Sequence, residues 1–123
     1  MRNRLILAIA ALSLTAGLSA ALADVTDRFV AVDRVGVAKE NALSGTPMLE
    51  ITGVREGTAA PVTQTYGTFS GTTNSDVKVL ERCERFALLA QARPGRYVLE
   101  IVRTDTSGDN GYHIRFCRLA RVD

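Results

Sequence analysis

The 123-residue sequence contains no tryptophan, a single histidine and only two cysteines. So few histidines and cysteines exclude the usual four-ligand structural metal site, which is built mainly from these residues. The chain also lacks a phosphate-binding glycine loop, a G-x-S-x-G nucleophile motif and a paired-carboxylate signature. These absences predict a protein that is not an enzyme and that uses no cofactor or metal.

The N-terminus has the pattern of a secretory signal. Arg2 and Arg4 precede an uncharged, mostly apolar run, residues 5–23, which ends in Ala21-Leu22-Ala23. The run is nearly long enough for a retained membrane anchor, but its small residues and its A-x-A ending favour cleavage after Ala23. We therefore expect residues 1–23 to be removed, and a bacterial protein that is periplasmic or extracellular and has no membrane anchor after cleavage.

Removal of the signal changes the charge balance. The full chain has 15 basic and 13 acidic residues, and the signal contains two of the basic ones, so the mature chain has 13 of each. A net charge of zero predicts no general attraction to nucleic acid or to anionic membranes. The mature segment, residues 24–123, has 123 − 23 = 100 residues, which suits one small domain.

The two cysteines, Cys83 and Cys117, are predicted to form a disulfide, because cysteines in small exported proteins usually pair. Closing this loop would stabilise the fold by roughly 3–4 kcal/mol. The alternative is a catalytic Cys83 with His113, the only histidine, as its base. The absence of a C-x-x-C pair argues against disulfide exchange.

Apolar alternation bounded by turn residues predicts five strands, over residues 29–38, 48–55, 62–72, 97–104 and 112–122. Gly36 suggests a bulge or a bend in the first strand. In the last strand Ile114 and Phe116 are expected on one face and Cys117 on the other, with a bulge near Phe116–Cys117 allowing the disulfide.

A helix is predicted to begin near a T-x-x-D capping pattern, Thr73 to Asp76, and to end near Ala92, because Pro94 follows. One arc of this helix is apolar and contains Val79, Leu80, Cys83, Phe86, Ala87 and Ala90. A single helix between the third and fourth of five strands is the order of the OB-fold. The predicted fold is therefore mainly β, a small five-stranded OB-like barrel whose open end the helix fills.

Three surface features are candidate sites. Leu88 and Leu89 lie outside the apolar arc, so they either pack under a neighbouring loop or form an oligomer or partner interface. Arg115, Arg118 and Arg121 are candidate anion contacts, or else a solvated rim. The segment 105–111 resembles the start of a calcium loop, but Asn110 and Phe116 replace the required Gly and Glu, so a plain hairpin loop is expected.

Taken together, the signal, the mature length, the element order and the single disulfide resemble the B subunits of bacterial AB5 toxins. The stretch from Cys83 through Ala92 into YVLEI is most similar. The resemblance implies an OB-fold pentamer whose helices line a central pore and whose surface binds glycans. No residue motif is matched, so no glycan-binding residue carries over.

The expected function is thus a non-enzymatic binding module for a glycan or a protein, and a homo-oligomer if it is toxin-B-like. One alternative is a periplasmic inhibitor of a hydrolase, acting through loop 41–47 or 105–111. Another is a structural protein of the cell envelope.

Overall fold

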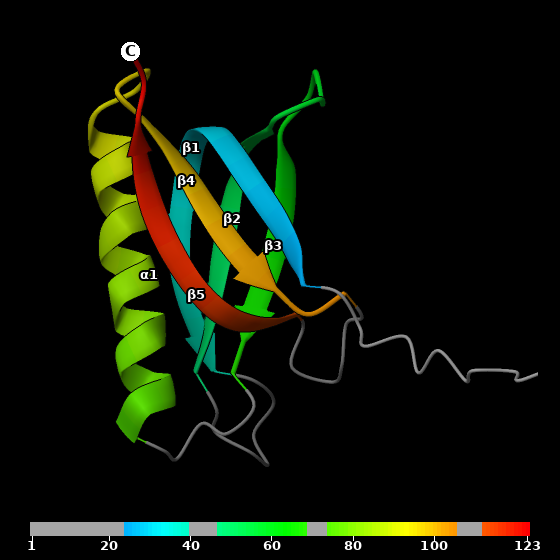
Figure 1. Cartoon of the computed structure of the whole chain (residues 1–123), viewed down its shortest axis with the longest axis vertical. Coiled ribbons are helices and arrows are strands. Elements are labelled where there is room, and N and C mark those ends of the chain that lie inside the picture. The colour runs from blue at the N-terminus through cyan, green and yellow to red at the C-terminus, as the bar shows by residue number, and fades with distance from the viewer. Residues whose placement is uncertain (1–23, 40–46, 69–73, 106–111) are drawn as a thin grey trace, which may run out of the picture.

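The computed structural model describes residues 24–39, 47–68, 74–105 and 112–123. Five strands and one helix follow one another along the chain (Figure 1). They are β1 (Val25–Lys39), β2 (Pro47–Arg55), β3 (Val62–Gly67), α1 (Asn74–Ala92), β4 (Tyr97–Arg103) and β5 (Tyr112–Arg121). The predicted elements are all present. β1 begins four residues earlier than predicted and β3 ends at Gly67, while the signal and loops 41–47 (except Pro47) and 106–111 lie outside the described residues.

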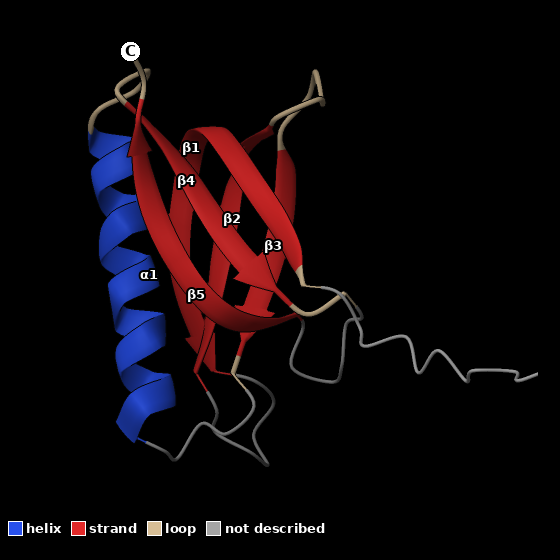
Figure 2. Cartoon of the chain, in the orientation of Figure 1, coloured by secondary structure: helices blue, strands red, loops and turns tan. Residues whose placement is uncertain are grey.

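The strands form a closed barrel in the order β1-β2-β3-β5-β4 (Figure 2). β1 is long enough to pair with two neighbours, with β4 along its first half and with β2 along its second. A short parallel contact between β3 and β5, Tyr66 with Tyr112 and Gly67 with His113, closes the circle. This arrangement confirms the predicted OB-like five-stranded barrel.

The helix completes the hydrophobic core. α1 contacts β1, β2, β4 and β5, and it runs alongside the barrel (Figure 1). Its buried residues Leu80, Cys83, Ala87 and Ala90 join a core built from the inward side chains of the strands. The predicted apolar arc therefore faces the barrel. α1 ends at Ala92, and Gly95, at φ 76°, makes the turn into β4, a conformation that favours glycine.

Cys83 and Cys117 form the predicted disulfide, with their Cα atoms 5.5 Å apart. The bond joins the middle of α1 to β5, and Cys83 is fully buried. It therefore fixes the helix against the barrel at the centre of their contact.

The predicted bulge at Gly36 is wrong. The pairing of β1 with β2 shifts register at two other places, where Val30 and Asp33 are the extra residues. Each bulge moves the following side chains to the opposite face, so the inward positions of β1 become Asp27, Phe29, Val32 and Val35. Strict alternation, which groups Phe29 with Val35 but not with Val32, could not reveal this.

The prediction that Ile114 and Phe116 lie on the same face of β5 is also wrong. Val102 pairs with Phe116 and Arg103 with Ile114, so Arg115 is an extra residue in β5. Because of this bulge, Ile114 and Cys117 both point to the core, whereas Phe116 is 46 % exposed. The bulge that the disulfide required is present, one residue before the predicted position.

Breaking the disulfide should weaken the whole barrel. We expect the Cys83→Ala/Cys117→Ala variant to unfold with a free energy roughly 3–4 kcal/mol lower than the wild type, measured by urea denaturation. An unchanged midpoint, with no free thiols in the wild type, would contradict this role of the bond.

Gly53 is required by a close approach between strands. A Cβ atom at Gly53 would lie 2.2 Å from the carbonyl oxygen of Ala31, between the two bulges of β1, whereas a Cβ at Gly36 meets nothing within 4 Å. Gly53→Ala should therefore lower stability by about 1–3 kcal/mol, and Gly36→Ala should change it by less than about 0.5 kcal/mol. Equal midpoints for the two variants in denaturant would refute the steric argument.

Candidate functional site

A polar cluster occupies the interior of the barrel at one side, and each strand supplies one member. The members are Asp27 from β1, Arg55 from β2, Tyr66 from β3, Arg103 from β4 and Tyr112 from β5. We call this group the Asp27 cluster. Asp27, Tyr66 and Arg103 are at most 7 % exposed, so the cluster replaces apolar packing at this side of the core.

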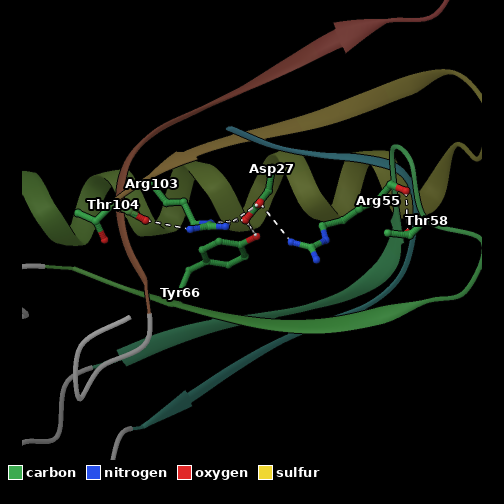
Figure 3. A network of polar contacts seen from close by, with 6 residues as sticks. All are labelled: Asp27, Arg55, Thr58, Tyr66, Arg103 and Thr104. Atoms are coloured by element: carbon green, nitrogen blue, oxygen red, sulfur yellow. Dashed lines mark hydrogen bonds and ion pairs between the residues drawn. The ribbon is translucent and has the colours of Figure 1, made fainter. Parts of the chain in front are cut away.

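The Asp27 carboxylate is the centre of the cluster (Figure 3). Arg103 donates two hydrogen bonds to it, from Nε at 2.6 Å and from Nη2 at 3.1 Å. The hydroxyl of Tyr66 donates a third at 2.7 Å, and Nη1 of Arg55 donates a fourth at 3.3 Å. Such a two-point arginine–carboxylate pair is strong and directional. Together, the four hydrogen bonds join β1, β2, β3 and β4 around one buried anion.

Burial and charge together fix the protonation states of the cluster. Burial and the hydrogen bond to Asp27 raise the pKa of Tyr66 far above its ordinary value, so this hydroxyl stays a donor. Burial alone would lower the pKa of Arg103, but the hydrogen bond and the charge of Asp27 outweigh it and raise the pKa. The Arg103 guanidinium also lies 3.8 Å from the ring centre of Tyr112, a favourable cation–π distance.

An open hollow of about 290 Å³ lies beside the Asp27 cluster. It is lined by Thr26, Asp27, Arg28, Arg55, Glu56 and Thr58. Arg55 joins the two features, since it touches Asp27 and its side chain is 30 % exposed. The lining of the hollow therefore contains arginine N–H donors, carboxylate acceptors and two threonine hydroxyls. Arg55 connects this lining to the interior of the barrel.

The β2–β3 turn beside the hollow is held by hydrogen bonds. The amide of Glu56 donates to the carbonyl of Arg28 at 2.8 Å, and the amide and the hydroxyl of Thr58 both donate to the carbonyl of Arg55, at 3.1 and 2.8 Å. Arg28 forms an ion pair with Glu56 and a second one, at 3.1 Å, with Glu100. The rim is thus an ordered surface.

On the outer face of the barrel, three strands carry a row of charges. Glu100 of β4 is 7 % exposed and accepts hydrogen bonds from Arg28 of β1 at 3.1 Å and from Arg118 of β5 at 2.7 Å. These residues are direct cross-strand partners. The row connects one rim residue of the hollow to β5.

The predicted site residues do not gather at this hollow. Because Cys83 and Cys117 are bonded to each other, neither is a thiolate nucleophile, and a Cys83–His113 dyad is excluded. His113 lies on β5, where its backbone pairs with Thr104. Leu88 and Leu89 are 46 % and 38 % exposed on α1, so they are not covered by the described part of the chain.

The three C-terminal arginines have separate surroundings. Arg118 contacts Glu100, and Arg115 contacts Asp24 at 3.3 Å. Arg121 is exposed at the end of β5, opposite Tyr97. Their role as anion contacts stays a prediction, as does the interface role of Leu88 and Leu89. The candidate loops 41–47 and 105–111 lie almost entirely outside the described residues.

The Asp27 cluster was not among the predicted sites, although a signal for it is visible in the sequence. Arg103 has the same parity in β4 as the core residues Leu99 and Ile101, and Arg55 has the same parity in β2 as Leu49 and Ile51. A charged residue at an inward position needs a buried partner. Asp27 could not be recognised as their partner, because it precedes Phe29, where the first strand is predicted to begin.

Among the described residues, no group of three or more histidine, cysteine or carboxylate side chains could hold a metal ion. Within the same residues, no helix has the length and apolar character needed to cross a membrane. No family model matches the chain, and neither the curated proteins nor the solved structures contain a significant match. The likeness to AB5 B subunits therefore stays a prediction from topology.

The hydroxyl of Tyr66 should make stability depend on alkaline pH. Its pKa is raised on folding, so the unfolded chain loses this proton at lower pH than the folded one, and the stabilisation falls as the pH rises above about 10. We expect Tyr66→Phe to lose about 1.5–3 kcal/mol at neutral pH, because its bond partner is charged, and to show a shallower alkaline decline. Urea denaturation from pH 7 to 11 measures both effects.

Tyr97→Phe is the matched control, since it removes a phenol outside the Asp27 cluster. It should leave the alkaline decline of the wild type in place. The same steep decline in Tyr66→Phe would show that Tyr66 is not its source.

Proposed function

We propose that the mature chain is an exported, non-enzymatic binding module, and that the hollow beside the Asp27 cluster binds a saccharide. The observation that carries this proposal is the mixed lining of the hollow on an ordered rim. Sugar hydroxyls both donate and accept hydrogen bonds, so they need both kinds of partner. Arg55 supplies donors, Glu56 supplies acceptors, and Thr26 and Thr58 supply groups that do either.

The two carboxylates of the hollow support binding more than hydrolysis. Glycoside hydrolysis needs one carboxyl group that gives a proton and a second that attacks or activates water. Asp27 already accepts four hydrogen bonds, and Glu56 is paired with Arg28. The carboxylates of Asp27 and Glu56 are therefore better suited to accept hydrogen bonds from a ligand than to donate a proton or attack it.

The fold supports the same proposal. The disulfide and the Asp27 cluster hold the strands in place, so the rim is organised before a ligand arrives and binding orders little of the protein. Export to the periplasm or beyond, which the signal predicts, places such a module where cell-surface saccharides occur.

A protein ligand is the second candidate, because the turn after β2 projects from the barrel (Figure 1), and its residues Glu56 and Thr58 line the hollow. Thr58, Ala59, Ala60 and Pro61 are all exposed in it. A projecting turn held by hydrogen bonds suits the inhibitor hypothesis, in which a loop enters the cleft of a hydrolase. In this form of the inhibitor hypothesis, residues 56–61 would contact the hydrolase, in place of loops 41–47 and 105–111.

A glycan array tests the saccharide proposal, with Arg55→Gln as the diagnostic variant. Arg55→Gln removes the exposed cation but leaves Arg103 and Tyr66 on Asp27, so the barrel should remain folded. We expect binding of the best glycan to weaken at least about tenfold, the equivalent of one lost hydrogen bond to a charged group. Arg34→Gln, an exposed arginine of β1 away from the hollow, should bind as the wild type does.

Two results would overturn the proposal. One is a wild-type protein that binds no glycan on the array, and the other is glycan binding that Arg55→Gln leaves unchanged. Recovery of a single hydrolase from periplasmic extract, lost on shortening of the 56–61 turn, would instead establish the inhibitor function.

A further inference from the structure

The outward face of α1 is exposed along its whole length and has a composition that the core does not explain. At 100° per residue, Lys78, Glu81, Arg82, Arg85, Leu88 and Leu89 all lie on this face, and every one of them is exposed. We call it the outer helix face. It lies on the side opposite to the buried residues Leu80, Cys83 and Ala87, and the barrel places no described strand over it.

The charges on the outer helix face are strongly one-sided. Lys78, Arg82 and Arg85 are basic, and Arg93 and Arg96 continue the series in the exposed turn after the helix. Glu81 is the only acidic residue among them, and the stretch from Arg85 to Leu99 contains three arginines and no carboxylate. A mature chain with an expected net charge of zero would therefore carry a local excess of positive charge here.

The surroundings of this face only partly offset the excess. Asp76 and Glu84 are on the same helix and are half-buried. Asp33 of β1 lies beside the helix, where its backbone carbonyl accepts a hydrogen bond of 2.8 Å from Gln91. Arg34 follows Asp33 directly and is exposed, so the neighbouring strand adds no net negative charge.

Two adjacent leucines interrupt the basic side chains. Leu88 is 46 % exposed and Leu89 is 38 % exposed, and Arg85 and Arg93 stand one turn before and after them. The surface is that of a single helix, and a hollow of about 250 Å³ on it is lined by Lys78, Glu81, Arg82 and Arg85.

We propose that the outer helix face binds peripherally to an anionic phospholipid bilayer. Basic side chains near such a surface are attracted to its phosphate groups, and exposed leucines can enter the boundary between headgroups and acyl chains. A flat bilayer can meet an exposed helix face along its length. The β2–β3 turn lies on the other side of the barrel from α1 (Figure 1), and its residues Glu56 and Thr58 line the hollow, so a bound membrane leaves both open.

Binding to vesicles tests the proposal on the exported wild-type protein. We expect it to sediment with vesicles of phosphatidylglycerol and phosphatidylcholine at low salt, and to remain in solution with phosphatidylcholine alone. High salt should release it, because the attraction is screened. Arg82→Glu/Arg85→Glu should weaken vesicle binding at least about tenfold.

A matched pair of single variants changes the net charge by the same amount at two places: Arg85→Glu lies on the outer helix face, and Arg115→Glu lies on β5 away from it. Only Arg115→Glu should retain binding. Equal losses in the two single variants would overturn the proposal, because the attraction would then be a general effect of charge. Binding to a soluble acidic protein without binding to phosphatidylglycerol vesicles would also overturn it, in favour of a protein partner.

The lack of tryptophan allows a direct test of leucine insertion. In Leu89→Trp the new indole should shift its fluorescence to shorter wavelength on addition of phosphatidylglycerol vesicles, because it enters a less polar layer. Val37→Trp, at a β1 position that is 50 % exposed, is the matched control and should not shift. A shift in Val37→Trp alone, or in neither variant, would contradict insertion at the outer helix face.

Discussion

The buried carboxylate of Asp27 is the constraint on which the arrangement of the strands depends. A buried charge without partners is very costly, and Asp27 finds its partners on β2, β3 and β4. Tyr112 of β5 then covers Arg103. The cluster is satisfied only when all five strands have their correct neighbours, so it disfavours other pairings of the same strands. Removing Asp27 itself would leave the buried Arg103 guanidinium without its ion-pair partner, and breaking a buried ion pair in this way typically costs about 3–5 kcal/mol.

The disulfide acts on a different part of the fold. It joins α1 to β5 through Cys83 and Cys117, on the side where the helix completes the core, whereas the Asp27 cluster lies where the hollow opens. One side of the barrel is therefore held by a covalent bond and apolar packing, and the other by ion pairs and hydrogen bonds. This division leaves polar groups at the rim of the hollow and an exposed outward face on α1, the two surfaces that we propose to bind ligands.

The fold could be predicted in outline because its signals are local. The helix has an apolar arc of fixed period, each strand is bounded by turn residues, and two cysteines in an exported chain pair with each other. The bulges at Val30 and Asp33 could not be predicted, and the one at Arg115 only to within a residue from the disulfide, since an extra residue is decided by the pairing of strands distant in sequence. For that reason the faces of Val32 and Phe116 were assigned wrongly, and the inward position of Asp27 was missed.

By itself, the sequence determined the element order, the disulfide and the approximate boundaries of the helix, because each depends on local patterns along the chain. Only the tertiary structure decided where charges gather. Asp27 meets Arg103 across 76 positions, and the exposed charges on the outward face of α1 are mostly basic. The net charge is a sum over all residues and does not depend on their positions. Electrostatic attraction, however, depends on the distances between charges, which are set by folding.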